Sequence, residues 1–194
     1  MAATLITSNQ VRINDLKSID MPKATKTYVP VSHYDLAMNV GSIGERVIDK
    51  ELHSKKFGIA RKGQHMFGTF TYKNPEDEIG LSIGFRNSYD KSMSIGVCVG
   101  AKVFVCENLM MTGEVTFMRK HTGNILEELN SLIFNVLYNS EDKFSTLQED
   151  KESMKTVDIS NQDAWSTMGV LFGKGIINTP QISIMRKEWK NPSH

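Results

Sequence analysis

Apolar side chains occupy every second position through much of residues 56–106, most clearly at 79–85 and 95–99. Short polar or turn-forming segments separate these runs, at 61–64, 73–78, 88–91 and 100–101. A period of two is that of a β-strand with one buried face, and connections this short leave no room for crossover helices. The pattern predicts an antiparallel β-meander of about five strands.

Helical periodicity flanks this region on both sides. Ser32 and Asp35 form a start similar to a capping box, and apolar residues follow it at i, i+4, i+7 and i+11. Asn124 begins a longer stretch whose wide apolar stripe predicts an amphipathic helix. Two shorter helices are expected to begin at Ser160 and Thr179. The predicted fold class is α+β: an N-terminal helix, an antiparallel β-meander, a long amphipathic helix packed on the sheet, and small C-terminal helices.

The same patterns divide the chain into four segments. Residues 1–30 are polar and lack a sustained period, which predicts an arm that is extended or ordered only by a partner. The α+β core is expected at 31–139. Residues 140–158 are acidic and poor in apolar side chains, so they predict a mobile connection or a frayed continuation of the long helix. Residues 159–194 are expected to carry the C-terminal helices.

Composition narrows the class of protein. The 194 residues are 40% hydrophobic and 23% charged, which suits a globular core and excludes a wholly disordered or collagen-like chain. Apolar stretches are only a few residues long, far short of the ~20 needed to cross a bilayer, and the first residues do not resemble a secretory signal. Two cysteines suit a reducing compartment. We therefore expect a soluble, cytoplasmic protein with no membrane partner.

Charge is nearly balanced overall but uneven along the chain. The formal net charge is +1. Residues 46–121 carry a net +4, residues 127–158 a net −5, and the residues from 174 onward a net +3. One interpretation is two solvated faces of opposite sign. The other is a basic central face that meets an anion.

Residues suited to catalysis or metal binding are sparse. The five histidines form no pair at i, i+3 or i+4, and no phosphate-binding loop, dinucleotide motif or nucleophile elbow occurs. Cys98 and Cys106 are expected to be reduced and structural, whether they share a straight strand or Gly100–Ala101 turns a hairpin that sets Cys98 opposite Val103. A zinc site from both cysteines and His121 is the weaker alternative. We expect no cofactor, no metal and no enzymatic activity.

Three groups of polar and cationic side chains stand out in and just after the meander. They are Lys55, Lys56, Arg61 and Lys62; Arg86, Asn87, Ser88, Tyr89 and Lys91; and Arg119, Lys120 and His121. Cations and hydroxyls bind phosphate oxygens, and interleaved aromatic rings stack bases, so the pattern is typical of a sheet that tracks a flexible single strand. The alternative is a set of decorated turns, with the aromatic residues in the core and Glu127 or Glu128 paired with Arg119.

Residues 80–122 carry motifs of a known kind: Asn87–Asp90 closing a strand, Cys106–Leu109 closing the next, and Arg119–Thr122 before a helix. In this order they resemble a family of phage- and plasmid-borne proteins classed as a domain of unknown function, number nine-three-two. Lys91 stands where the family often has glycine. The resemblance covers about residues 30–175 and implies a mobile-element context in a bacterial cytoplasm, but no established activity.

The predicted order of elements is also loosely similar to the core of the single-strand annealing proteins, which form rings or filaments with a basic groove. Two hypotheses follow. The first is a single-stranded-DNA-binding or annealing protein that acts as a homo-oligomer. The second is a phage interaction protein that inhibits a host defence system by binding a host protein. Salt separates them, because phosphate binding weakens steeply as salt rises and an apolar interface does not.

Overall fold

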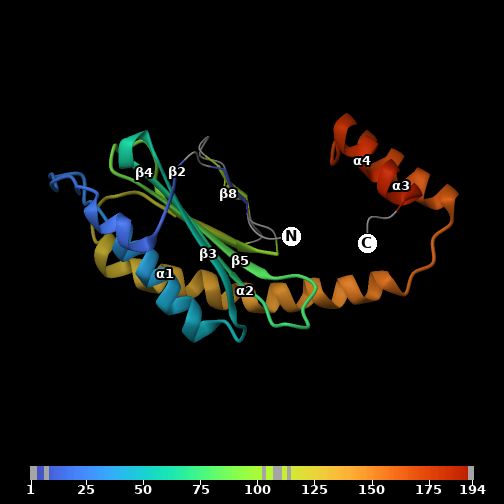
Figure 1. Ribbon diagram of the computed structural model, residues 1–194, viewed down its shortest axis with the longest axis horizontal. Coiled ribbons are helices and arrows are strands. Elements are labelled where there is room, and N and C mark those ends of the chain that lie inside the picture. The colour runs from blue at the N-terminus through green and yellow to red at the C-terminus, as the bar shows by residue number, and fades with distance from the viewer. Residues whose placement is uncertain (1–3, 7–8, 102–103, 107–110, 113–114, 192–194) are drawn as a thin grey trace. The chain divides into compact units, whose positions relative to one another are not determined.

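The computed structural model describes residues 4–6, 9–101, 104–106, 111–112 and 115–191. The chain folds into two compact units, residues 1–149 and residues 150–194. The first unit contains two β-sheets with the helices that cover them, and the second is a pair of helices (Figure 1).

The larger sheet is an antiparallel meander. Its strands, in spatial order, are β2 (Asn9–Val11), β3 (Leu52–Ala60), β4 (His65–Tyr72), β5 (Leu81–Ser88), β6 (Ile95–Gly100) and β9 (Val115–Arg119). Every neighbouring pair is antiparallel. This confirms the predicted α+β class and its meander, and it adds one strand at each edge that the alternation did not single out.

The strand expected directly after Gly100 does not pair with β6. Cys98 lies opposite Thr116 of β9, so the hairpin at Gly100–Ala101 that would set Cys98 opposite Val103 is wrong. β9 takes that place because it extends the apolar side of the sheet: Phe117 lies opposite Val97 and packs against the core.

A second sheet uses the segment that was expected to follow β6. It joins β1 (Thr4–Ile6) in parallel to β7 (Phe104–Cys106), and β8 (Met111–Thr112) pairs antiparallel with β7. These strands lie next to β3–β6, on the side of the larger sheet away from the helices (Figure 1). The side chains of residues 102–115 lie outside the described part of the structure, and with them the side chain of Cys106.

The first helix forms as its spacing predicts. In α1 (His33–Val47) the hydroxyl of Ser32 accepts a hydrogen bond from the Asp35 N–H, which caps the helix. Its buried side chains include Leu36 and Val40, which join the hydrophobic core under the sheet. A short 3-10 helix, η1 (Ile13–Ser18), precedes α1 and buries Leu16.

The segment before α1 is not a free arm over its described length. Strand β2 pairs with β3, and the side chains of Leu16, Tyr28 and Val31 are all at most 4% exposed. These anchors are too widely spaced in the sequence to produce a period, so the expected arm at 1–30 is a packed strap from residue 9 onward.

The long helix α2 (Ile125–Lys155) covers the same face of the sheet as α1 (Figure 1). It confirms the predicted long helix on the sheet, and it corrects the mobile connection expected at 140–158, because the helix continues to Lys155. Phe144, one helical repeat of seven residues after Leu137, is buried in the core and holds this continuation in place. Apart from the half-buried Glu141, the acidic residues of this stretch are exposed.

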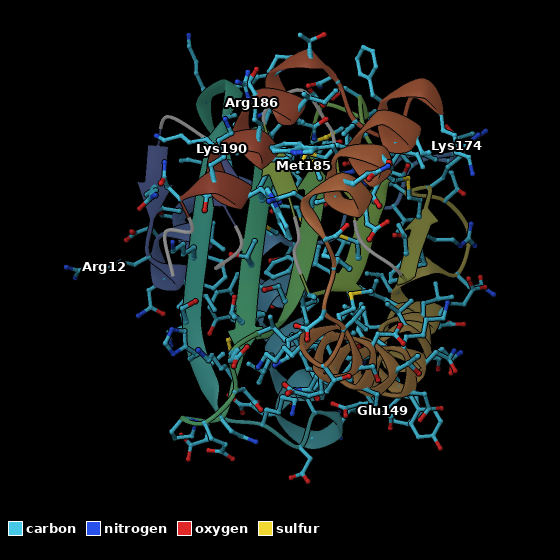
Figure 2. The ribbon with its side chains drawn as sticks, turned by 90° about the vertical axis from the view of Figure 1, so that its right-hand side faces the viewer. Arg12, Glu149, Lys174, Met185, Arg186 and Lys190 are labelled. Carbon is cyan, nitrogen blue, oxygen red and sulfur yellow. The ribbon has the colours of Figure 1, made fainter. Side chains whose placement is uncertain are left out.

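The C-terminal unit begins within the last turn of α2 and consists mainly of α3 (Asn161–Gly173) and α4 (Thr179–Lys190). Capping boxes begin both helices, at Ser160 and Asn178, as the sequence predicts for the first of them. The Trp189 indole donates a hydrogen bond to Asn161 Oδ1 across the pair. Figure 2 shows Lys174, Arg186 and Lys190 on the outside of this unit, where all three are exposed.

None of the helices in the described residues is both long enough and apolar enough to span a membrane.

Close packing of aromatic rings organises the centre of the larger sheet. Phe70 stacks on Phe85 with ring centroids 5.4 Å apart, and Phe57 meets both rings edge-on. Gly68 lies opposite Phe85 on the neighbouring strand, and a Cβ at that position would overlap the Phe85 ring.

We predict that Gly68→Ala lowers the free energy of unfolding by about 1–3 kcal/mol, because the added methyl group must displace the Phe85 ring in a filled core. Gly169→Ala is the control: this glycine lies inside α3 with no atom near its missing Cβ, so the substitution should preserve stability or raise it by up to about 1 kcal/mol. Urea denaturation followed by circular dichroism measures both. Equal effects of the two substitutions would contradict the packing argument.

Candidate functional site

Three connections meet at one end of the larger sheet. They are the β3–β4 turn, which contains η2 (Arg61–Gly63), the β5–β6 turn at 89–94, and the link from β9 to α2 at 120–124. The register places them together, because Ala60 pairs with His65, His65 with Ser88, and Ile95 with Arg119. The N–H of Tyr89 also donates to the carbonyl oxygen of Gln64 at 2.7 Å, which ties the first two turns directly.

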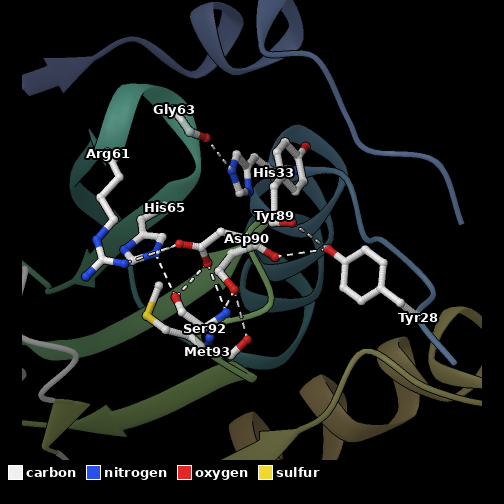
Figure 3. Close-up of polar contacts among 10 residues, drawn as sticks. Tyr28, His33, Arg61, Gly63, His65, Tyr89, Asp90, Ser92 and Met93 are labelled. Carbon is white, nitrogen blue, oxygen red and sulfur yellow. Dashed lines mark hydrogen bonds and ion pairs between the residues drawn. The ribbon is translucent and has the colours of Figure 1, made fainter. Parts of the chain in front are cut away.

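Asp90 is the centre of a polar cluster at this end (Figure 3). Its carboxylate accepts hydrogen bonds from the hydroxyl and the N–H of Ser92 at 2.6 and 3.0 Å, and its Oδ2 lies 2.8 Å from His65 Nε2. Arg61 approaches the same Oδ2 at 3.3 Å. Partial burial alone would raise the pKa of Asp90, but the bonds from Ser92 and His65 outweigh it and hold the pKa at about 2.

The cluster has the residue types of a hydrolase triad but not its geometry. In a triad the carboxylate and the hydroxyl contact opposite nitrogens of the imidazole. Here Asp90 Oδ2 and Ser92 Oγ both lie 2.8 Å from the same atom, His65 Nε2, and the Ser92 hydroxyl donates its hydrogen to Asp90. The imidazole is therefore not placed to take a proton from Ser92, and what the cluster does is fix the β5–β6 turn.

That turn holds Lys91 in a left-handed backbone conformation, with φ +64°. Glycine adopts this conformation without strain, whereas a residue with a Cβ pays a modest cost. The ammonium group of Lys91 lies 4.9 Å from the centre of the Tyr28 ring, within cation–π range. The turn therefore presents a cation beside the N-terminal strap.

His33 is buried beneath these turns. Its Nε2 lies 3.0 Å from the carbonyl oxygen of Gly63, so this nitrogen carries the hydrogen, and Nδ1 accepts from the Asn87 amide at 3.0 Å. The ring stacks on Tyr89 with centroids 3.7 Å apart. Burial is the main cause that lowers the pKa of His33 to about 4, so the side chain is neutral at physiological pH.

A pocket of about 360 Å³ opens beside the Asp90 cluster. Three segments line it: the strap, the β5–β6 turn and the β9–α2 link. The lining residues are Thr27, Tyr28, Lys91, Ser92, Met93, Ser94, Lys120, His121 and Thr122. The pocket thus combines two lysines and several hydroxyls with the apolar surfaces of a tyrosine and a methionine.

His121 is the most unusual residue of this pocket. Its side chain is only 5% exposed, and among the described residues neither ring nitrogen has a hydrogen-bond partner. Its carbonyl oxygen accepts the Val29 N–H at 2.8 Å, and its ring lies 5.3 Å from that of Tyr28. Burial lowers the pKa of His121, and a weaker interaction with the Val29 backbone acts in the opposite direction.

Several residues predicted to bind a ligand have internal partners instead. The Asn87 amide donates to the carbonyl oxygen of Val31 at 2.7 Å, and the Ser88 hydroxyl donates to that of Met93 at 3.0 Å. The Tyr89 hydroxyl accepts the His33 N–H at 2.9 Å. All three predicted residues are buried, so they build the turn rather than offer donors to a phosphate, as the decorated-turn alternative supposed.

Arg86 and Arg119 also differ from the expectation of free cations. Arg86 is 7% exposed and points to the sheet face away from α1 and α2, where its guanidinium approaches the Met118 sulfur at 3.5 Å. Burial lowers its pKa. Arg119 donates two hydrogen bonds to Glu128 Oε2, at 3.0 and 3.2 Å, which is the pairing expected under the alternative.

The remaining predicted cations divide into two places. Arg61, Lys62, Lys91 and Lys120 are exposed at the turn end of the sheet. Lys55 and Lys56 are exposed farther along β3, opposite Phe70 and Thr69, and do not reach this end. The aromatic residues interleaved with these cations are all at most 4% exposed and lie in the core, as the alternative supposed: Phe57, Phe67, Phe70, Tyr72 and Tyr89.

The structure adds residues that the sequence analysis did not select. Tyr28 and Thr27 come from the strap, and His33 and His65 come from the start of a helix and of a strand. In the sequence, Tyr28 in a largely polar segment could have indicated that the strap is anchored. Nothing in the sequence indicated the roles of His33 and His65, because their partners are distant along the chain.

Metal binding finds no support in the described part of the chain, where no three His, Cys, Asp or Glu side chains come together. Cys98 is buried within β6 and forms no disulfide among the described residues. It lies opposite Thr116, five residues before His121. A zinc site from Cys98 and His121 therefore does not form among the described residues.

We predict that acid weakens the fold through His33. Below pH 6.5 the unfolded chain takes up a proton at this residue, whereas the folded protein excludes it until about pH 4. The free energy of unfolding should therefore fall by about 1.4 kcal/mol per pH unit across this range, about 3 kcal/mol in total.

Urea titrations between pH 7 and pH 4 measure this slope. In His33→Gln the dependence of the unfolding free energy on pH should be weaker by the contribution of one proton. The contribution of His121, whose pKa is also lowered, should remain. A slope identical to that of the wild type would show that His33 does not carry the effect.

Comparison with known families matches residues 25–176 to the family described as "Domain of unknown function (DUF932)". A search of curated proteins found no match, and neither did a search of solved structures. The matched range contains α1, the meander strands from β3 to β9, α2 and α3. This chain therefore belongs to the DUF932 family.

Proposed function

We propose that this protein binds single-stranded nucleic acid at the turn end of the larger sheet, without catalysis. The observation that carries the proposal is the gathering of exposed cations, Arg61, Lys62, Lys91 and Lys120, at this end of the sheet. Two of them, Lys91 and Lys120, lie on the rim of a pocket lined with hydroxyl groups. Lysine, arginine and hydroxyl side chains are the groups that proteins use to contact nucleic-acid phosphates.

The pocket favours a flexible strand over a duplex. A volume of about 360 Å³ suits one nucleotide unit. A duplex presents its phosphates on a regular surface and keeps its bases stacked inside, whereas a single strand bends and exposes its individual units. A single strand can therefore place successive phosphates on the rim while one unit enters the recess.

The proposed contacts are to phosphate and do not depend on base sequence. The ring residues of the sheet are in the core and take no part. The four exposed cations of the turn end instead supply an attraction that releases counterions and weakens as salt rises. The proposal therefore keeps the phosphate contacts of the single-strand hypothesis and drops the stacking of bases on the sheet.

We predict that Lys91→Asn and Lys120→Gln each weaken binding to a labelled single strand and lower the slope of log affinity against log salt by about 0.7, the value for one phosphate contact. Asparagine at residue 91 tolerates the left-handed backbone, so the fold should persist. Fluorescence anisotropy over a range of salt concentrations measures both quantities.

Lys143→Gln is the matched control. Lys143 is exposed on α2, eighteen residues beyond the helix start, which is ~27 Å at 1.5 Å per residue. Its removal changes the net charge equally but should leave the salt slope unchanged. The same loss in all three variants would mean that binding is a property of net charge, and absence of binding by the wild type at low salt would reject the proposal.

A second candidate function is association with another protein, for which a face of α2 is the specific observation. Leu126, Phe134 and Tyr138 are 60%, 45% and 63% exposed and lie on one side of the helix, with the last two rings stacked at 5.8 Å. The acidic stretch at 127–158 and the basic residues from 174 onward, which also expose apolar side chains, are complementary in charge. We therefore propose a second copy of the chain as the partner on this face, and a host protein as the alternative.

We predict that the wild type forms oligomers at tens of micromolar and that Phe134→Glu shifts it toward single chains, because a charge replaces an apolar contact. Asn139→Glu, on a neighbouring exposed position of α2, is the control and should leave the assembly unchanged. Light scattering measures the mass of the particles. A wild-type protein that is monomeric throughout would exclude the second copy and leave a host protein as the partner of this face.

A further inference from the structure

His121 presents an unmet hydrogen-bonding requirement inside the pocket. A neutral imidazole has one N–H donor and one bare acceptor nitrogen. Both nitrogens are buried, and among the described residues neither has a partner. Leaving buried polar atoms unpaired is costly, so such a side chain on a pocket wall indicates that a further molecule completes its bonding.

The state of the ring limits what that molecule can be. Burial lowers the pKa of His121, and the facing charges in the pocket, Lys91 and Lys120, are both positive, so the ring is neutral at physiological pH. A phosphate diester offers only acceptors and satisfies only the N–H. The edge of a nucleobase offers both donors and acceptors, so it can bond to a ring nitrogen of His121 in either tautomer of the imidazole.

The walls of the pocket fit the same kind of group. Tyr28 and Met93 give it apolar surface, and the hydroxyl residues Ser94 and Thr122 give it further donors and acceptors. An aromatic ring and a thioether give a small organic ring apolar surface to pack against, and the placed polar groups around them can fix its orientation. The two lysines on the lining are positioned for the phosphates that flank such a ring.

We propose that the pocket receives one unstacked nucleobase of the bound strand, with the base edge hydrogen-bonded to His121 and the flanking phosphates at Lys91 and Lys120. This inference rests on the proposed single-strand binding and specifies what the recess contributes to it. The rim cations supply affinity that depends on charge, and the pocket adds affinity that depends on the presence of a base.

The pocket wall is rigid where the inference needs it to be. The His121 carbonyl oxygen is held by the Val29 N–H, and the Tyr28 hydroxyl lies 3.2 Å from the carbonyl oxygen of Ser88. The β5–β6 turn is fixed by Asp90 through both polar groups of Ser92. A site prepared in this way loses little conformational entropy when the base enters.

The test compares two strands of equal length and charge: oligothymidylate, and the same backbone with abasic residues throughout. Wild-type protein should bind the base-bearing strand about tenfold more tightly, the effect of one well-placed set of hydrogen bonds in a buried site. In His121→Phe, which keeps a ring and removes both nitrogens, the two strands should bind almost equally and with the affinity of the abasic strand. His121→Gln, which keeps a donor and an acceptor, should recover part of the difference.

The outcomes separate this inference from the proposed function. Equal affinity of wild-type protein for the two strands, with the salt dependence retained, would overturn the base pocket and leave single-strand binding intact. No binding of either strand at low salt would overturn both.

A second measurement avoids dependence on the folding of the His121→Phe variant. In wild-type protein with nitrogen-15-labelled histidine, the ring signals of His121 should move on addition of oligothymidylate and stay in place with the abasic strand. Identical movement with both strands would contradict a base contact.

Discussion

The hydrogen bonds of His33 connect the three parts of the protein that form its turn end. One ring nitrogen donates to the β3–β4 turn at Gly63, the other accepts from Asn87 at the end of β5, and the ring itself stacks on Tyr89. Because His33 is also the first residue of α1, these bonds set where the helix begins relative to the sheet. The side chain must be neutral to serve both partners, since a protonated ring has no acceptor for the Asn87 amide.

The two faces of the larger sheet explain why the candidate site is at its end. The face toward α1 and α2 is apolar and closed by their side chains. The opposite face carries buried polar groups that satisfy one another, such as Thr71 and Ser82 with hydroxyl oxygens 3.1 Å apart. A cation on that face, Arg86, is enclosed rather than presented to a ligand. Apart from Lys55 and Lys56 on β3, the predicted cations that stay exposed therefore lie where the strands turn and the backbone leaves both layers.

Local patterns in the sequence were sufficient for the elements that make their own periodic contacts. Ser32 and Ser160 begin helices where their capping bonds are expected, and the alternation in 79–85 and 95–99 lies in neighbouring strands of one sheet. The partner of β6 could not be deduced in this way. The alternation indicated a strand directly after Gly100 and did not single out 115–119, where Phe117 packs against the core.

For the candidate site, too, the sequence indicated what depends on neighbouring residues and not what depends on distant ones. Charge patterning located the three turns, because lysine and arginine gather there. It could not separate the exposed Lys91 from the buried Arg86 five residues earlier, because burial depends on which face of the strand each side chain takes. Nor could it assign Asn87 and Ser88 to the interior, since their partners Val31 and Met93 become neighbours only when the strap and the turn are folded.

The pocket wall includes the strap, whose hydrogen-bond partners are synthesised much later than the strap itself. Val29 leaves the ribosome early, but the carbonyl oxygen that receives its N–H belongs to His121, about ninety residues later. Tyr28 likewise waits for Ser88. Until the meander and the link to α2 exist, the strap has nothing to bind and the pocket has only part of its wall. The recess is therefore complete only after the first and middle thirds of the chain have folded against each other.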